Sequence, residues 1–548
     1  MDTSFAHVTE LAKTKYHRKS DRYINYGTAG FRTKAADLTH IMFRMGLLAV
    51  LRSKYKKATI GVMITASHNP VEDNGIKLVD PMGEMLAANW EHYASELANV
   101  TDSEVKTVLN KIIQEATIDM SEKSNIFLAR DNRPSSVTLA SAFLEGVSCF
   151  KSHFHDFGEM TTPMLHYVVR CENTQKRYGK PTEDGYYEKL GEAFLKLRGS
   201  KPSCPGLYKP RLILDAANGV GAEKVCLLKH HLNDALDIEV LNDGSDGILN
   251  HECGADFVKT RQKLPTGLPL KVGDRYVSFD GDADRIVYFY IDKNSKFHLL
   301  DGDKIACLVA KYLKDLLNTC ELDLKLGNVL TAYSNGSAKE YISKTLGVDV
   351  ACTPTGVKHL HHKATEYDIG IYFEANGHGT VIFSGHAEDV ILNTAGNTEL
   401  PIEKRVAAQK LCTLVDLINQ AVGDSISDML LIETILHSLG WDVEKWSNIY
   451  QDRPYSLCQV KVKDKSIFKT TFDEQRLIEP KELQDAIDEL VAKYTEGRSF
   501  VRASGTEDIV RVYTEAKSLD EVKQLSFAVC EKVYDIGHGV GDRPVRSA

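Results

Sequence analysis

The sequence predicts an α/β protein of several domains that ends in a smaller α+β domain. Its 548 residues exceed what one compact core can hold and correspond, at roughly 150 residues per domain, to about three or four domains. Short apolar runs end in small or polar residues and are followed by helical periodicity, which is typical of strand–loop–helix units. From residue 446 onward the order differs, with helices on either side of two strand-like runs.

Three apolar runs predict strands of the α/β part. They cover residues 60–64, 126–128 and 212–214, and small or polar residues follow each of them closely. The segments 218–224 and 335–340 both begin with Asn-Gly after an apolar run, which suggests a repeated α/β domain.

The end of the chain predicts the α+β domain, with a boundary near residues 446–454. Apolar side chains over residues 483–494 follow the i, i+3, i+4, i+7 pattern of one helical face. Two strand-like runs, separated by a polar loop over residues 502–508, come next. Ser518 and Glu521 then form a capping box that begins a second helix.

The composition is that of an ordinary globular protein. Hydrophobic residues make up 43% and charged residues 26%, which excludes collagen, a coiled coil and wholesale disorder. The net charge of −9 provides no general cationic field for nucleic acid or anionic lipid. The 11 cysteines include no CxxC pair, which predicts reduced thiols. No apolar run approaches the ~20 residues of a membrane span, so we expect a cytoplasmic protein with no membrane, nucleic-acid or obligatory protein partner.

The first segment that could carry chemistry is Thr-Ala-Ser-His-Asn-Pro at residues 65–70. It directly follows a predicted buried strand, so the Ser67 hydroxyl would be exposed at the strand's carboxyl end, the ligand-binding edge of an α/β sheet. Lys77 follows closely enough to bring a cation back to this loop. Because Ser, His, Asn and Pro all favour turns, a polar turn without function is an open alternative.

The second segment is Asp-Gly-Asp-Ala-Asp-Arg at residues 280–285, between two apolar strand-like runs. Its three carboxylates at alternate positions would lie on one side of an extended chain, where a cation would relieve their repulsion. Oxygen ligands in a short loop favour Mg²⁺, which commonly binds a phosphate oxygen as well. An EF-hand is excluded, because Arg285 stands at the sixth position, where that loop must turn, and Ile291 stands at the twelfth, which must be acidic. A solvated acidic turn would rarely lie between two apolar strands.

The third segment is Glu-Ala-Asn-Gly-His-Gly-Thr at residues 374–380. A carboxylate, an amide and an imidazole within five residues can hydrogen-bond the vicinal hydroxyls of a sugar. A glycine-rich turn with a hydrogen-bonded Glu374 fits the same residues equally well.

The fourth segment is Arg-Ala-Ser-Gly-Thr-Glu at residues 502–507, followed by Arg511. Small residues let backbone N–H groups converge on an anion, and guanidinium groups can clamp phosphate oxygens. It is neither a Walker loop nor a dinucleotide fingerprint, and residues 219–221 lack the third glycine of a dinucleotide site. The histidines within 359–362 have no cysteine or helical i, i+4 partner, so a polar face fits them better than zinc.

These four segments, in this order, resemble the α-D-phosphohexomutase family over nearly the whole chain. The opening segment Tyr-Gly-Thr-Ala-Gly-Phe-Arg at residues 26–32 matches that family as well. The third and second segments are most similar to the branch that acts on N-acetylglucosamine phosphates. In most of the family an Arg-Asp-x-Arg segment precedes the serine loop, but here it follows at residues 130–133. We therefore expect a permuted first domain, as in that branch, whose strand order the sequence leaves open.

The resemblance implies three α/β domains with mixed sheets and a smaller C-terminal α+β domain, arranged around a central cleft. The expected domains are residues 1–180 with the phosphoserine loop, 181–298 with the metal-binding loop, 299–445 with the sugar-binding loop, and 446–548 with the phosphate-binding loop.

The resemblance also implies an enzyme. It would be an intramolecular phosphotransferase that interconverts N-acetylglucosamine 6-phosphate and N-acetylglucosamine 1-phosphate, feeding UDP-N-acetylglucosamine synthesis. The expected cofactors are Mg²⁺ and a sugar 1,6-bisphosphate as activator and intermediate, and the expected partner is a hexosamine phosphate substrate. A phosphoglucomutase or phosphomannomutase, a catalytically silent sugar-phosphate-binding protein and a Mg²⁺-dependent phosphatase are the alternatives.

Residue roles follow from the same resemblance. Ser67 would carry a phosphoryl group, and His68 or Lys77 would accept or relay a proton. The implied catalytic residues are Ser67, His68, Lys77, Arg32 and Arg285, and the implied metal ligands are Ser67, Asp280, Asp282 and Asp284. The implied substrate-binding residues are Glu374, Asn376, Gly377, His378, Arg502, Ser504, Gly505, Thr506 and Arg511. Residues 355–358 are a candidate wall for an acetyl group.

Overall fold

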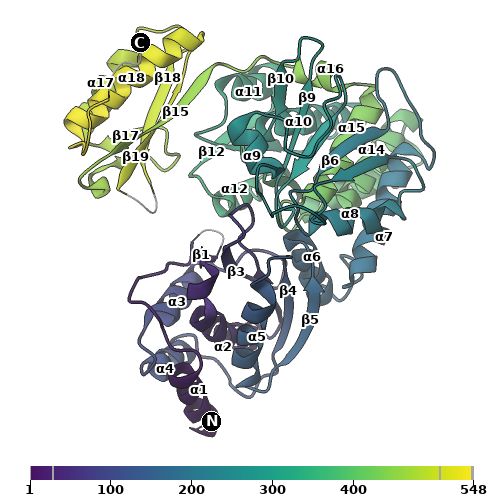
Figure 1. Cartoon of the computed structure of the whole chain (residues 1–548). Helices are drawn as coiled ribbons and strands as arrows, with labels where there is room; N and C mark the ends of the chain where they lie inside the picture. The colour runs from purple at the N-terminus through teal and green to yellow at the C-terminus, as the bar shows by residue number, and fades with distance from the viewer. Residues whose placement is uncertain (1, 28–29, 505–507, 545–548) are drawn as a thin grey trace. The chain divides into compact units, whose positions relative to one another are not determined.

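The computed structural model describes residues 2–27, 30–504 and 508–544, with side chains from residue 5 onward. The chain divides into two compact units. The first comprises Met1–Gly302, Asn376–Val381 and Ala395–Val443, and the second comprises Asp303–Ala375, Ile382–Thr394 and Glu444–Ala548. Both units combine helices with β-sheets (Figure 1), which confirms the predicted α/β class.

The first sheet of the first unit is mixed and has the order β1-β3-β2-β4-β5. Its central strand β2 runs parallel to β4 and antiparallel to β3, which settles the strand order that the sequence left open. The apolar run predicted as the first strand is fully buried in β2. The strands are β1 (Phe31–Lys34), β2 (Thr59–Ile64), β3 (Asp73–Val79), β4 (Asn125–Arg130) and β5 (His153–Glu159).

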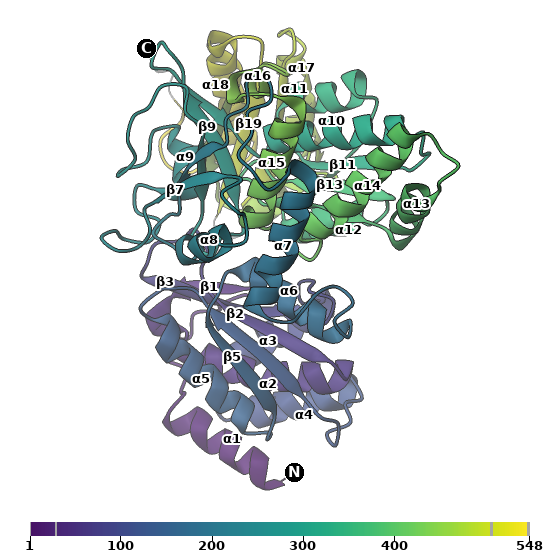
Figure 2. The same cartoon turned by 90° about the vertical axis from the view of Figure 1, so that its right-hand side faces the viewer.

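Helices pack on this sheet (Figure 2), and two of them cross at very close range. α2 and α5 meet where Gly46 faces Gly146, and a Cβ on Gly46 would lie 2.2 Å from the Phe143 carbonyl oxygen. The crossing therefore requires glycine. The helices that precede or surround this sheet are α1 (Asp2–Thr14), α2 (Thr39–Lys56), α3 (Ala88–Asn99), α4 (Val105–Glu115), α5 (Ser136–Ser148) and α6 (Thr162–Asn173).

The second sheet of the first unit has the order β10-β9-β8-β6-β7 and is also mixed. β6 is parallel to β7 and β8, whereas β8 and β9 are antiparallel and are joined by the acidic segment 280–285. Its strands are β6 (Arg211–Asp215), β7 (Asp237–Leu241), β8 (Tyr276–Phe279), β9 (Ile286–Ile291) and β10 (Phe297–Leu300). The neighbouring helices are α7 (Glu183–Arg198), α8 (Gly221–Lys229), α9 (Gly254–Arg261), α14 (Ile402–Leu417) and α15 (Ser425–Leu439), of which α14 and α15 pack on α7.

The third large sheet has the order β12-β11-β13-β14, and its strands β11, β12 and β13 belong to the second unit. β11 is parallel to both β12 and β13. The strands are β11 (Leu326–Thr331), β12 (Asp349–Thr353), β13 (Ile369–Phe373) and β14 (Gly379–Phe383). The helices near them in sequence are α10 (Gly302–Cys320), α11 (Gly336–Glu340), α12 (Val357–Ala364) and α13 (Gly385–Gly396).

The end of the chain forms the α+β part, as the sequence predicts. Both predicted helices are present, and the capping box of Ser518 and Glu521 begins the second one. The sequence missed a third strand, β15, and a two-stranded hairpin. The elements are α16 (Val443–Ser447), β15 (Tyr455–Lys461), β16 (Lys469–Thr470), β17 (Leu477–Glu479), α17 (Lys481–Val491), β18 (Arg498–Ala503), β19 (Ile509–Glu515) and α18 (Leu519–Ile536).

Among the described residues, the structure has no helix that combines the length and the apolar character needed to cross a bilayer.

The close crossing of α2 and α5 gives a prediction for stability. We expect Gly46→Ala to lower the free energy of unfolding by about 1–3 kcal/mol or more, because the added methyl group collides with backbone rather than with a movable side chain. A shift of the urea midpoint in far-UV circular dichroism measures this loss.

Gly385→Ala is the matched control, since a Cβ at Gly385 in α13 meets nothing within 4 Å. Equal midpoints for the two variants would contradict the packing argument.

Candidate active site

The serine turn follows β2 and is held by its backbone. Ser67 has a left-handed backbone with φ 52°, and its N–H donates to Thr65 Oγ1 at 2.9 Å. Its carbonyl oxygen accepts hydrogen bonds from Arg133 Nη2 at 2.9 Å and from Asn250 Nδ2 at 2.8 Å. A residue with a Cβ keeps this conformation only where its surroundings impose it, so these contacts set the direction of the Ser67 side chain.

Arg133 is the main support of the turn, and the sequence analysis assigned it no role. Its guanidinium is buried, pairs with Asp131 at 2.9 Å and donates to the carbonyl oxygens of Asn69 and Pro70 as well. The sequence signal that could have indicated this role is the Arg-Asp-x-Arg segment itself, because its oppositely charged residues can form a buried ion pair. That segment therefore orders the serine turn from a neighbouring strand.

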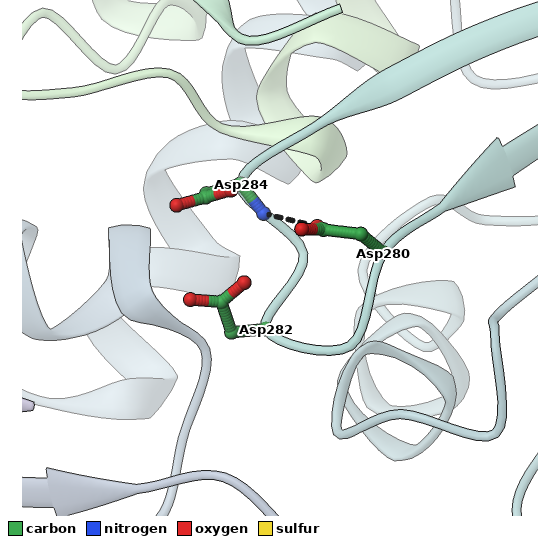
Figure 3. A group of neighbouring side chains, drawn as sticks. All are labelled: Asp280, Asp282 and Asp284. Atoms are coloured by element: carbon green, nitrogen blue, oxygen red, sulfur yellow. Dashed lines mark hydrogen bonds between the residues drawn. The ribbon is translucent and has the colours of Figure 1, made fainter. Parts of the chain in front are cut away.

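The acidic loop between β8 and β9 brings three carboxylates together (Figure 3). Asp280, Asp282 and Asp284 are buried, and one carboxylate oxygen from each lies within 4.8 Å of the others. The loop is a turn, because Ala283 has φ 56° and the N–H groups of Asp284 and Arg285 donate to Asp280 Oδ1. The prediction of an extended chain here is wrong, although its consequence, three acids facing one point, is confirmed.

The serine turn and the acidic loop meet directly. Ser67 Oγ donates to Asp280 Oδ2 at 2.7 Å. A Cβ on Gly281 would lie 2.7 Å from the Ser67 carbonyl oxygen, so the approach requires glycine at that position. The prediction of an exposed Ser67 hydroxyl is wrong, because the acidic loop packs against the serine turn and buries this side chain. The two segments lie in one site, as the resemblance implied.

Cationic and hydroxyl groups surround the acids. Lys77 Nζ lies 3.1 Å from Asp282 Oδ2 and 3.1 Å from Asp284 Oδ2. Thr162 Oγ1, at the start of α6, donates to Asp282 Oδ2 at 2.6 Å; the sequence analysis missed this residue, which carries no motif. Arg285 Nε lies 3.9 Å from Asp284 Oδ1. These groups offset part of the negative charge.

The pKa values of two of the acids, Asp280 and Asp284, are shifted in opposite directions. Burial, followed by the charges of Asp284 and Asp282, raises the pKa of Asp280 well above its usual range. Burial would also raise the pKa of Asp284, but the charges of Lys77 and other nearby basic groups outweigh it and hold that pKa below its usual range. The pKa of Lys77 is raised despite its burial, because Asp282 and Asp284 are close. One carboxyl of the triad is thus poised to hold a proton.

The other two predicted catalytic residues also lie near the acids. His68 Nδ1 is 3.4 Å from Ser67 Oγ, and burial together with Arg285 and Arg32 lowers the pKa of His68 to about 2. The imidazole is therefore neutral. Arg32, from β1, has its own pKa lowered by burial and by Arg285, while the three aspartates oppose that shift.

The donor set fits a hard divalent cation. Three of the four implied ligands are carboxylates, the fourth is the Ser67 hydroxyl, and the buried Oδ1 of Asp282 has no hydrogen-bond partner among the described residues. A buried carboxylate oxygen without a partner is costly, and a cation would satisfy it. The arrangement can therefore hold an ion beside the Ser67 hydroxyl.

The segment predicted to bind sugar packs on the acidic loop. His378 is buried, and its Nδ1 forms a hydrogen bond with the Asp284 carbonyl oxygen and lies 3.6 Å from Asp284 Oδ1. The Ile286 N–H donates to the Gly377 carbonyl oxygen at 3.2 Å. The His378 N–H donates to Asn376 Oδ1 at 2.9 Å. The His378 side chain thus supports the acidic loop directly.

The remaining predicted substrate-binding residues belong to the second unit. Glu374 directly follows β13. Arg502 lies near the end of β18, Ser504 directly follows that strand, and Arg511 lies on β19. Arg502 and Arg511 are direct cross-strand partners. Gly505 and Thr506 lie outside the described residues, as do Thr28 and Ala29 of the opening segment.

Family models match most of the chain. The models of phosphoacetylglucosamine mutase AMG1 domains II and III match residues 179–287 and 301–441. The model of phosphoglucomutase/phosphomannomutase alpha/beta/alpha domain I matches residues 45–103 and 98–177, and the model of the C-terminal domain matches residues 457–532.

Similar proteins cover nearly the full length. The phosphoacetylglucosamine mutase of Homo sapiens is 51% identical over 97% of this chain and 98% of its own length, and that of Candida albicans is 48% identical over 93% and 96%. The structure of Aspergillus fumigatus N-acetylphosphoglucosamine mutase with GlcNAc-6P and magnesium matches with TM-score 0.92 and 46% identity, over 97% of this chain and 99% of that chain.

A solved N-acetylglucosamine-phosphate mutase of the α-D-phosphohexomutase superfamily, in its substrate complex, also matches this chain. Its TM-score is 0.92 and its identity 46%, over 96% of this chain and 99% of that chain. The fold and the site thus define a protein of this superfamily. Within that superfamily, the chain belongs to the phosphoacetylglucosamine mutase family and is an enzyme. The resemblance inferred from the sequence is confirmed.

We expect a divalent cation to expel a proton when it binds the three acids. Because the pKa of Asp280 is raised, this carboxyl is protonated at pH values where ordinary carboxyls are ionised, and a cation binds only the ionised form. Affinity should therefore rise with pH, by up to about tenfold per unit below that pKa. Mn²⁺ calorimetry in two buffers of different ionisation enthalpy counts the released protons.

Asp280→Asn is the control: it removes the titrating group together with one ligand, so it should bind Mn²⁺ more weakly and without this pH dependence. An affinity that does not change with pH in the wild-type chain would contradict this assignment.

Proposed function

We propose that the chain interconverts N-acetylglucosamine 6-phosphate and N-acetylglucosamine 1-phosphate through a phosphoserine at Ser67 and a sugar 1,6-bisphosphate. The observation that carries the proposal is the 2.7 Å hydrogen bond from Ser67 Oγ to Asp280 Oδ2, at a cluster of acids that suits a divalent cation. Relatives solved with GlcNAc-6P and magnesium, and as a serine-to-alanine variant with glucose 1,6-bisphosphate, support the substrate class and both cofactors.

Mg²⁺ held by Asp280, Asp282 and Asp284 would neutralise charge on the transferring phosphoryl oxygens, where the loose transition state spreads it. Lys77, protonated between Asp282 and Asp284, can donate to the same oxygens. Arg32 and Arg285 add positive charge around the reacting group. These residues would thereby supply electrostatic stabilisation, and the contacts of the serine turn would orient Ser67 for the transfer.

A proton must leave the hydroxyl that attacks the phosphoryl group. Of the two candidate acceptors, Lys77 is held in its charged form by two carboxylates, whereas His68 is neutral and lies 3.4 Å from Ser67 Oγ. Because a pKa of about 2 makes His68 a weak base, we assign to His68 a hydrogen bond with the Ser67 hydroxyl rather than storage of the proton, and we assign phosphate binding to Lys77.

The bisphosphate must turn round between the two transfers. The backbone and side chains of Arg502, Ser504, Gly505, Thr506 and Arg511 would bind the phosphate that is not reacting, and Glu374 and Asn376 would bind ring hydroxyls. Binding at a remote phosphate orients the reacting end, which lowers the barrier by proximity. His378 would act mainly through Asp284, as its contacts indicate. Each of the four expected domains, residues 1–180, 181–298, 299–445 and 446–548, would contribute one of the four segments to this cycle. The product would feed UDP-N-acetylglucosamine synthesis.

The phosphoserine is tested by mass spectrometry of the Ser67 peptide. We expect the mass of one added phosphate group after treatment with the sugar 1,6-bisphosphate, and none in Ser67→Ala. This variant should lose roughly three orders of magnitude or more in kcat, since it lacks the nucleophile, while substrate affinity stays within a few-fold. An unmodified Ser67 peptide in an active preparation would refute the proposal, and net release of inorganic phosphate faster than isomer formation would make the protein a phosphatase.

The substrate is tested by comparing kcat/KM for N-acetylglucosamine 6-phosphate with that for glucose 6-phosphate and mannose 6-phosphate. We expect the acetylated sugar to be preferred by at least about tenfold, the size of a specificity that rests on one added group. Equal values would favour a phosphoglucomutase or phosphomannomutase.

A further inference from the structure

Two arginines face each other where the phosphate is expected to bind. Arg502 on β18 and Arg511 on β19 are direct cross-strand partners, and like charges in that position repel each other. The charges of both guanidiniums act on half-buried Tyr333: desolvation raises the pKa of this side chain, and the two positive charges lower it. An anion placed at this pair therefore removes an unfavourable interaction as well as making a favourable one.

The chain provides such an anion itself. Glu474 Oε2 accepts a hydrogen bond from Arg502 Nη1 at 3.0 Å, and both side chains are largely buried, with 18% and 16% exposed. The same oxygen accepts from the Thr355 N–H at 3.0 Å and from the Thr355 hydroxyl at 2.7 Å. One carboxylate oxygen thus accepts hydrogen bonds from three converging donors. Proteins bind a phosphate oxygen in the same way.

Glu474 is held firmly in this position. It stands in the turn between β16 and β17, with a left-handed backbone of φ 58°. The Thr471 N–H donates to the Arg476 carbonyl oxygen at 2.8 Å, and the Gln475 N–H donates to Asp473 Oδ1 at 3.3 Å. A residue with a Cβ keeps such a backbone where its surroundings hold it, so this turn presents Glu474 in a defined direction.

We propose that Glu474 is an internal substitute for the substrate's phosphate: its carboxylate competes with that phosphate for Arg502 and Thr355. This inference rests on the proposed function, in which Arg502 binds the phosphate that is not reacting. The proposed cycle requires that phosphate to be released once per turnover, when the bisphosphate turns round. Release would leave a largely buried guanidinium unpaired, which is costly, unless another anion takes the position.

Competition and simple support of Arg502 predict opposite results for one substitution. Glu474→Gln removes the negative charge but keeps an oxygen that can accept the Thr355 and Arg502 hydrogen bonds. If the carboxylate competes with phosphate, the variant binds phosphate more tightly. If it only holds Arg502 in place, the variant binds phosphate equally or less tightly.

The experiment is calorimetric titration of N-acetylglucosamine 6-phosphate into the full chain carrying Ser67→Ala, with and without Glu474→Gln. We expect a Kd about three- to tenfold lower with Glu474→Gln, the size typical of one close charge at a partly buried site. In the chain with Ser67 intact, KM and kcat should both fall, because release becomes slower. An unchanged or higher Kd overturns the proposal.

Two further variants make the outcome specific. Glu496→Gln removes the same charge from an ion pair with Arg453 at 3.4 Å in the same unit, and it should leave Kd unchanged; an equal tightening there would make the effect a general one of net charge and overturn the proposal. Arg502→Ala tests the underlying function: if it leaves Kd unchanged, the proposed phosphate site is wrong. Weaker binding by Arg502→Ala without tightening by Glu474→Gln refutes the role of Glu474 alone.

Discussion

The mutual repulsion of three buried carboxylates is the constraint on which the active site depends. Asp280, Asp282 and Asp284 lie together and need compensating charge: burial and the charges of Asp284 and Asp282 raise the pKa of Asp280, whereas nearby basic groups hold the pKa of Asp284 low. Lys77 and Arg285 supply part of the compensation, and a divalent cation would supply the rest.

Support for the site comes from chain segments that are far apart in sequence. Arg133 and Asn250 hold the Ser67 carbonyl oxygen, while Thr162 donates to Asp282. The acidic loop is held from another direction, since the N–H of Ser425, at the start of α15, donates to the Ala283 carbonyl oxygen at 3.1 Å. Each contact fixes a backbone or an acid rather than reacting, so the geometry of the site is a property of the first unit as a whole.

Motifs with a local chemical reason could be predicted from the sequence, and partners set by tertiary packing could not. The acid triad, Ser67 and the capping box of Ser518 are visible because spacing and residue type already express their chemistry. Thr162 carries no such signal, since its role follows from where α6 begins relative to the acidic loop. The left-handed backbone of Ala283 was missed for the same reason: alternation suggested a strand, and the contacts of Asp280 impose a turn.

The discontinuous make-up of the first unit has a consequence for biosynthesis. Its segments Met1–Gly302, Asn376–Val381 and Ala395–Val443 are interrupted by residues of the second unit. A growing chain that has left the ribosome as far as Gly302 lacks α15, whose Ser425 contacts the acidic loop, and it lacks His378. More than a hundred further residues must therefore be synthesised before the active site can assemble. Until then the incomplete first unit would expose apolar surface that chaperones could bind.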